Sequence, residues 1–194
     1  MSSPDICRIA RSLSVPGWHI DALPVADGGE GTTDCFLDAC GGRKLSAAVT
    51  GPFGDPLTAC CGLLPDGTAV VECAAAAGLL QAESRLDSER ATTYGVGQLL
   101  AHVLDCRPRQ LILGLGGSCT NDGGCGAAAA LGAVFYDQQG RPFVPTGGTL
   151  SRLSAIDLHG LHPALHTTPL TVMCDIRNPL YGPDGAACVF APQK

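Results

Sequence analysis

An apolar strand that ends in a glycine-rich loop is the feature that most restricts the fold of this chain. Residues 110–115 are typical of a buried strand, residues 116–124 form a polar loop with four glycines, and the small apolar residues at 125–131 predict the start of a helix. Backbone N–H groups of such a loop can point at a ligand, and the dipole of the following helix favours negative charge. The segment therefore predicts an α/β protein with an anion site beyond the end of this strand.

The polar residues of this loop supply the first candidate site. We expect Asp122 to act in catalysis and its neighbours to contact substrate, namely Gly116, Gly117, Ser118, Thr120 and Asn121. The loop contains no Gly-Lys-Ser/Thr and is not a Walker A motif, and the acid inside it also departs from the dinucleotide pattern G-x-G-x-x-G. Because Ser, Thr, Asn and Asp are also good helix caps, a purely structural capping cluster remains open.

Further acids follow other expected strands. Asp27 and Glu30 lie among glycines directly after an expected strand at Trp18–Val25, where they suit a metal ion or a substrate hydroxyl. The alternative is a capping turn, with Glu30 near the dipole of a helix expected at Thr32–Cys40. Asp175 ends a second expected strand, Thr168–Cys174.

Glu72 and Asn178 are weaker candidates for substrate binding. Glu72 ends a strand expected at Thr68–Glu72 and precedes a run of alanines, so it can face a ligand. Asn178 follows Asp175 closely, although the dipeptide Asn178-Pro179 by itself marks only a turn. We expect both side chains to help bind substrate.

The remaining pattern mixes parallel and hairpin units. Residues 45–72 alternate and turn as antiparallel strands do, whereas amphipathic helices are expected at 4–14 and Thr92–Leu104. The mixture predicts two packed α/β parts.

Composition excludes several classes of protein. The net charge of −6 opposes a nucleic-acid or anionic-membrane partner, and no apolar run approaches the ~20 residues of a membrane span. Only two lysines occur, Lys44 and Lys194, so a phosphate site needs Arg, a metal ion or further sequence. The eleven cysteines form no C-x-x-C pair and lie largely in apolar segments, which indicates reduced thiols in a cytoplasmic protein.

Seven segments, in order, resemble the bacterial-type glycerate kinase family. The matching segments are Pro24–Thr32, Val49–Gly54, Glu72–Leu79, Thr92–Gly97, Gly114–Gly124, Cys174–Leu180 and Phe190–Lys194. The resemblance covers nearly the whole chain from Leu23 onward. Small departures are Cys119, Arg177 and Ala191, each at a position where the family usually has another residue.

The resemblance implies a two-part α/β architecture with the active site in the cleft between the parts. Residues 1–45 would form a partial Rossmann-like domain and residues 46–194 a mixed α/β second domain. It implies transfer of the ATP γ-phosphoryl group to D-glycerate with Mg²⁺, giving 2- or 3-phosphoglycerate. Asp27, Asp122 and Asp175 are then the catalytic candidates, and Asp27 and Glu30 the metal candidates.

The family pattern also extends beyond this chain at both ends. It begins with a strand and an Asp-Ser-Phe-Lys loop and continues past Lys194, so we expect a truncated kinase with too few cations to turn over alone. A non-catalytic fragment or pseudoenzyme that keeps part of the ligand site is the alternative. A dinucleotide-binding module is a third and weaker interpretation.

Overall fold

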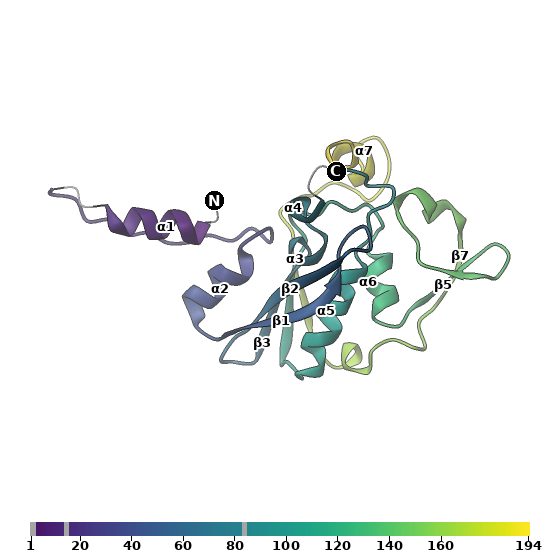
Figure 1. Cartoon of the computed structure of the whole chain (residues 1–194), viewed down its shortest axis with the longest axis horizontal. Helices are drawn as coiled ribbons and strands as arrows, with labels where there is room; N and C mark the ends of the chain where they lie inside the picture. The colour runs from purple at the N-terminus through teal and green to yellow at the C-terminus, as the bar shows by residue number, and fades with distance from the viewer. Residues whose placement is uncertain (1–2, 14–15, 83–84) are drawn as a thin grey trace.

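A five-stranded mixed sheet forms the centre of the protein (Figure 1). The computed structural model describes residues 3–13, 16–82 and 85–194. The strand order is β1-β2-β3-β4-β8, with bounds β1 Arg43–Thr50, β2 Pro56–Leu63, β3 Thr68–Glu72, β4 Gln110–Gly114 and β8 Leu170–Met173. These strands confirm the expected α/β class and the antiparallel section that the alternating residues predicted.

The direction of the strands decides where a site can lie. β1, β2 and β3 pair antiparallel, whereas β3, β4 and β8 are parallel. Glu72 pairs with Gly114, and Gly114 pairs with Met173. The carboxyl ends of these three strands therefore meet at one edge of the sheet, which is where α/β proteins bind ligands.

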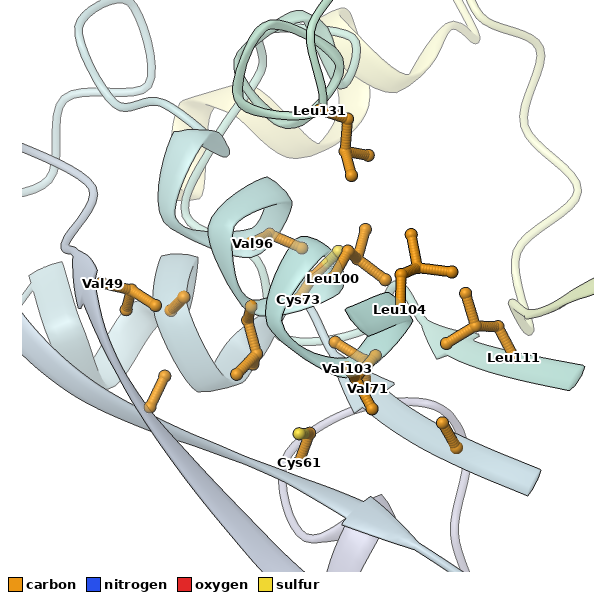
Figure 2. Close-up of a cluster of buried hydrophobic side chains, with 14 of the residues drawn as sticks. Val49, Cys61, Val71, Cys73, Val96, Leu100, Val103, Leu104, Leu111 and Leu131 are labelled. Atoms are coloured by element: carbon orange, nitrogen blue, oxygen red, sulfur yellow. The ribbon is translucent and has the colours of Figure 1, made fainter. Parts of the chain in front are cut away.

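One face of the sheet is covered by α5 (Tyr94–Asp105), as Figure 2 shows. Leu99, Val103 and Leu104 of this helix are at most 1% exposed and pack with apolar residues of β2, β3 and β4. Beyond α5 lies α6 (Cys125–Ala130). The two helices approach so closely that a Cβ on Gly97 would lie 2.7 Å from the Cα of Ala127.

The opposite face is partly covered by α2 (Thr32–Cys40), which has the predicted bounds. Its side chains reach β2, since a Cβ on Gly62 would lie 3.1 Å from Thr33 Cγ2. The first helix, α1 (Ser3–Ser12), stretches away from this body in Figure 1. No helix in the described ranges is both long and apolar enough to cross a membrane.

The expected strand at Trp18–Val25 is wrong. The described residues of this segment are neither helix nor strand. Trp18, Leu23 and Val25 are 75%, 79% and 75% exposed, so no sheet covers the apolar side chains that suggested a strand. A strand needs neighbours for its backbone groups as well as a suitable pattern.

A smaller antiparallel sheet, in the order β6-β5-β7, lies apart from the main one. The remaining elements are β5 Val134–Asp137, β6 Pro142–Phe143, β7 Leu153–Asp157, α3 Ala74–Ala77, α4 Leu79–Ala82, α7 Ala186–Phe190, η1 Gly147–Arg152, η2 Pro163–His166 and η3 Ala191–Gln193. The division into domains at residue 45 stays a prediction.

Candidate functional site

Two glycine-rich loops that are distant in sequence lie in direct contact at the carboxyl edge of the sheet. The Gly116 N–H donates to the Gly28 carbonyl at 3.0 Å. A Cβ on Gly116 would lie 2.8 Å from Gly29 Cα, so only glycine permits this approach. On Gly117, a Cβ would lie 3.5 Å from Glu30 Cγ. The structure thus joins the loop after β4 to the loop before α2.

The carboxyl end of β8 also contacts these two glycine-rich loops. The Leu115 N–H donates to the Met173 carbonyl at 3.1 Å, and Gly28 lies against that carbonyl with φ 92°. Asp175 follows two residues later and is exposed. Asp27 is also exposed, and its Oδ1 accepts a 2.9 Å hydrogen bond from the Gly29 N–H. Acids on two separate segments therefore border the glycine-rich loops and are open to solvent.

Glu72 differs from these acids because it is buried. Its carboxylate accepts hydrogen bonds from the Thr33 N–H and, at 3.2 Å, from the Gly31 N–H. These donors are at the start of α2, whose N-terminal partial charge the carboxylate offsets. A hollow of about 180 Å³ adjoins Glu72, with Lys44 and Thr33 among its lining residues.

Asp122 is buried more deeply, with 1% exposed. Its Oδ2 accepts from the Thr93 N–H and hydroxyl, both at 2.8 Å, and from the Gly126 N–H at 3.1 Å. Its Oδ1 accepts from the Gly124 N–H at 3.0 Å. The carboxylate therefore holds the starts of α5 and α6 together, as the capping alternative requires. A role in catalysis stays a prediction.

The loop after β4 is fixed from its other side by the end of α3 and the start of α4. The Leu79 N–H donates to the Gly117 carbonyl at 3.0 Å, and the Cys119 N–H donates to the Ala77 carbonyl at 2.9 Å. Between these bonds the Ser118 side chain is half-buried. The predicted contact residues Thr120 and Asn121 continue this loop, Thr120 buried and Asn121 half-buried.

Among the residues that the structure describes, no hydrogen bond joins Asn178 to the glycine-rich loops. Its side-chain amide donates to the Asp184 carbonyl at 2.9 Å and so closes a local turn. Across the described residues, no group of three or more His, Cys, Asp or Glu side chains is arranged to hold a metal ion. Within the described ranges, the metal candidates Asp27 and Glu30 therefore belong to no cluster of three such ligands.

One residue at this edge, Lys194, was not among the candidates predicted from the sequence. Lys194 follows η3, and its Nζ donates to Ser118 Oγ at 2.9 Å and to the Thr120 carbonyl at 3.3 Å. Burial lowers the pKa of this ammonium group. The sequence did offer one signal for Lys194 as a site residue. The segment Phe190–Lys194, which resembles the family, contains one of the two lysines of the chain.

Three buried cysteines have raised pKa values. All eleven cysteines lie within the described ranges and are free there. The reduced state in the cell stays a prediction. Burial raises the pKa of Cys73 to about 12 and that of Cys61 to about 11, and it also raises the pKa of Cys119. None of these three thiols is poised as a nucleophile, because the thiolate is the reactive form.

Comparisons with known proteins agree with this architecture. The sequence model of the glycerate kinase family matches residues 1–194. The chain is 48% identical to the glycerate kinase of Bacillus subtilis (strain 168), over 92% of this chain and 47% of that protein. It is 44% identical to the glycerate 2-kinase of Escherichia coli (strain K12), over 89% of this chain and 46% of that one.

A solved structure shares the fold. It is a crystal structure of a protein assigned as glycerate kinase 2 of Salmonella typhimurium LT2, with a TM-score of 0.83 and 44% identity, covering 88% of this chain and 46% of that one. The chain spans about half the length of the relatives it matches. With a family match along its whole length, this chain belongs to the glycerate kinase family.

Proposed function

We propose that this chain carries part of the active site of a kinase that phosphorylates D-glycerate with ATP. The observation that carries the proposal is the contact between the Gly28–Gly29 backbone and Gly116 at the carboxyl ends of three parallel strands. Membership of the glycerate kinase family and the names of the relatives support the substrate.

The residues at this edge suit phosphoryl transfer. That reaction depends on positioning and on charge stabilisation more than on covalent chemistry by the protein. Glycine-rich backbone and the Ser118 hydroxyl can hold a phosphoryl group or the glycerate carboxylate. Asp27 and Asp175 are exposed and can accept a hydrogen bond from the attacking hydroxyl of glycerate.

The acidic pair also suits Mg²⁺. This ion is usually bound by one or two carboxylates together with substrate phosphates, so a complete protein cage is not required. Asp27 and Glu30 are both exposed and lie beside the glycine-rich loops. They would hold the ion, which neutralises charge on the nucleotide phosphates when bound.

The buried acids have a different role in this proposal. Asp122 and Glu72 accept hydrogen bonds from helix starts, so we assign them to positioning the loops around the site. Asp122 would act on turnover through α5, α6 and the 116–124 loop. Glu72 would act through α2 and the Asp27–Glu30 loop.

One observation favours the alternative that the 194-residue chain by itself is not catalytic. Asp27, Glu30 and Asp175 are all exposed, whereas phosphoryl transfer is fastest where water is excluded and electrostatic interactions are strong. We therefore expect the isolated chain to bind ligand without turning it over. A cytoplasmic location stays a prediction that rests on the cysteines.

The test is an ADP-release assay with D-glycerate, ATP and Mg²⁺. It compares the isolated chain with a chimera in which these residues replace the matching stretch of the Bacillus subtilis relative. We expect glycerate-dependent ADP release from the chimera and none from the isolated chain. A folded chimera without glycerate-dependent release would contradict the proposed function, whereas saturable turnover by the isolated chain would contradict only the expected inactivity.

A further inference from the structure

The ammonium group of Lys194 lies inside the glycine-rich loop after β4. Its Nζ is bonded to the Ser118 hydroxyl and the Thr120 carbonyl, which are both neutral. The preceding η3 (Ala191–Gln193) is held in place by the Ser88 hydroxyl, which donates to the Ala191 carbonyl at 3.3 Å. Lys194 is thus fixed at both its backbone and its charged end.

The two lysines of the chain differ in how their charge is compensated. Lys44 forms an ion pair with Asp34. Within the described ranges, no carboxylate forms an ion pair with Lys194, although this side chain is half-buried. Partial burial of a cation without a counter-ion is unfavourable, and the lowered pKa of Lys194 has this cause. An anion placed beside Nζ would remove that penalty.

The surroundings leave hydrogen-bond donors for such an anion. An ammonium group has three N–H donors, and two of them have partners here. Ser118 uses its oxygen as an acceptor for Lys194, which leaves the hydroxyl proton to donate elsewhere. The loop is held rigid by hydrogen bonds at Gly117 and Cys119, so these donors are pre-organised.

We propose that Lys194 and Ser118 together bind an oxyanion of the substrates. Resting on the proposed function, the oxyanion is either the carboxylate of D-glycerate or a phosphoryl group of the nucleotide. Both carry negatively charged oxygens that accept charge-assisted hydrogen bonds. Lys194 then supplies a fixed positive charge at the loop after β4, in a chain whose net charge is −6.

The number of lysines permits a direct test on the 194-residue protein. Selective ¹³C,¹⁵N-lysine labelling gives side-chain NMR signals from Lys44 and Lys194 only, and a Lys44→Arg variant assigns them. The protein is titrated separately with inorganic phosphate, ATP and D-glycerate, with glycerol as the neutral control and sodium chloride at matched ionic strength. The titrations distinguish the phosphoryl source from the carboxylate source.

We expect a saturable shift of the Lys194 signal with phosphate and ATP or with D-glycerate, and a rise of its pKa in the bound state. The Lys44 signal should respond no more than it does to sodium chloride. Absence of a saturable Lys194 response to all three anions would overturn the inference, as would equal responses of both lysines.

Variants provide a second measurement. Lys194→Gln should weaken binding of the responding anion about 10-fold or more, whereas Lys44→Gln should leave it unchanged. Circular dichroism checks that each variant is folded, and unchanged affinity in folded Lys194→Gln would overturn the inference. If Lys194 responds but the chimera releases no ADP, the proposed function fails alone. If the chimera is active and Lys194 is silent, the inference fails alone.

Discussion

The acids at the carboxyl edge of the sheet fall into a buried pair and an exposed pair, which differ in their hydrogen bonds. Glu72 and Asp122 are 7% and 1% exposed and accept hydrogen bonds from the starts of helices. Asp27 and Asp175 are exposed. Among the described residues, the hydrogen bond that the Asp27 carboxylate accepts comes from its own turn, from the Gly29 N–H. One motif can therefore contain both residues that build a site and residues that face the ligand, and burial distinguishes the two kinds.

The largest effect on stability is expected from Asp122. Asp122→Ala would leave the buried N–H groups of Thr93 and Gly126 without an acceptor, so we expect the free energy of unfolding to fall by about 3 kcal/mol or more. Urea unfolding followed by circular dichroism measures it. Asp175→Ala is the control and should change stability by no more than ~0.5 kcal/mol. Equal, small losses in both variants would erase the comparison.

The exposed acids should show the reverse behaviour. In the chimera, Asp27→Asn and Asp175→Asn should each lower turnover by about 100-fold if they position the reacting hydroxyl or the metal ion. Their free energies of unfolding should stay within ~0.5 kcal/mol of the parent. Asp38→Asn, an exposed change on α2, is the matched control and should leave turnover unaltered. Near-parent turnover in both test variants would remove the exposed acids from the site.

Glu72 provides a smaller test of the buried group. Glu72→Gln keeps one acceptor oxygen for the start of α2 but removes the negative charge, so we expect a loss of about 1–2 kcal/mol in unfolding free energy. The exposed Glu30→Gln should cost no more than ~0.5 kcal/mol. A larger loss for Glu30 than for Glu72 would reverse the assignment of the two acids.

The smallest expected effect is a difference in the rate at which exposed and buried cysteines react in the folded protein. With a thiol reagent at pH 8, we expect the exposed Cys40, Cys106, Cys174 and Cys188 to react quickly, because their thiolates are accessible. Cys61 and Cys73 are buried with raised pKa values and should react only after denaturation. Denatured protein should then show eleven thiols, and a reproducible deficit of two would indicate a disulfide.

Local patterns predicted much of the fold. The helix at Thr32–Cys40 was predicted with its observed bounds, because its signals, a glycine on each side and a regular apolar spacing, are local. The strand predicted at Trp18–Val25 failed because strand formation depends on a neighbour that no local pattern specifies.

The sequence predicted only part of the site. The ends of parallel strands gather at one edge, so Glu72, Gly116 and Asp175 are expected there from topology. The Asp27–Glu30 loop follows no strand, and its contact with Gly116 is seen only in the folded structure. The contact of Lys194 with Ser118 joins residues far apart in sequence. No spacing rule relates them, and only the folded structure could reveal it.

We infer that the loop before α2 and the loop after β4 form one ligand site. Backbone amide NMR of the ¹⁵N-labelled 194-residue protein tests it during separate titrations with ATP and D-glycerate. We expect the amides of Gly28 and Gly29 and those of Gly116 and Gly117 to shift together, with one shared dissociation constant, for at least one of these ligands. Shifts confined to one loop, or no saturable shift in either, would contradict it.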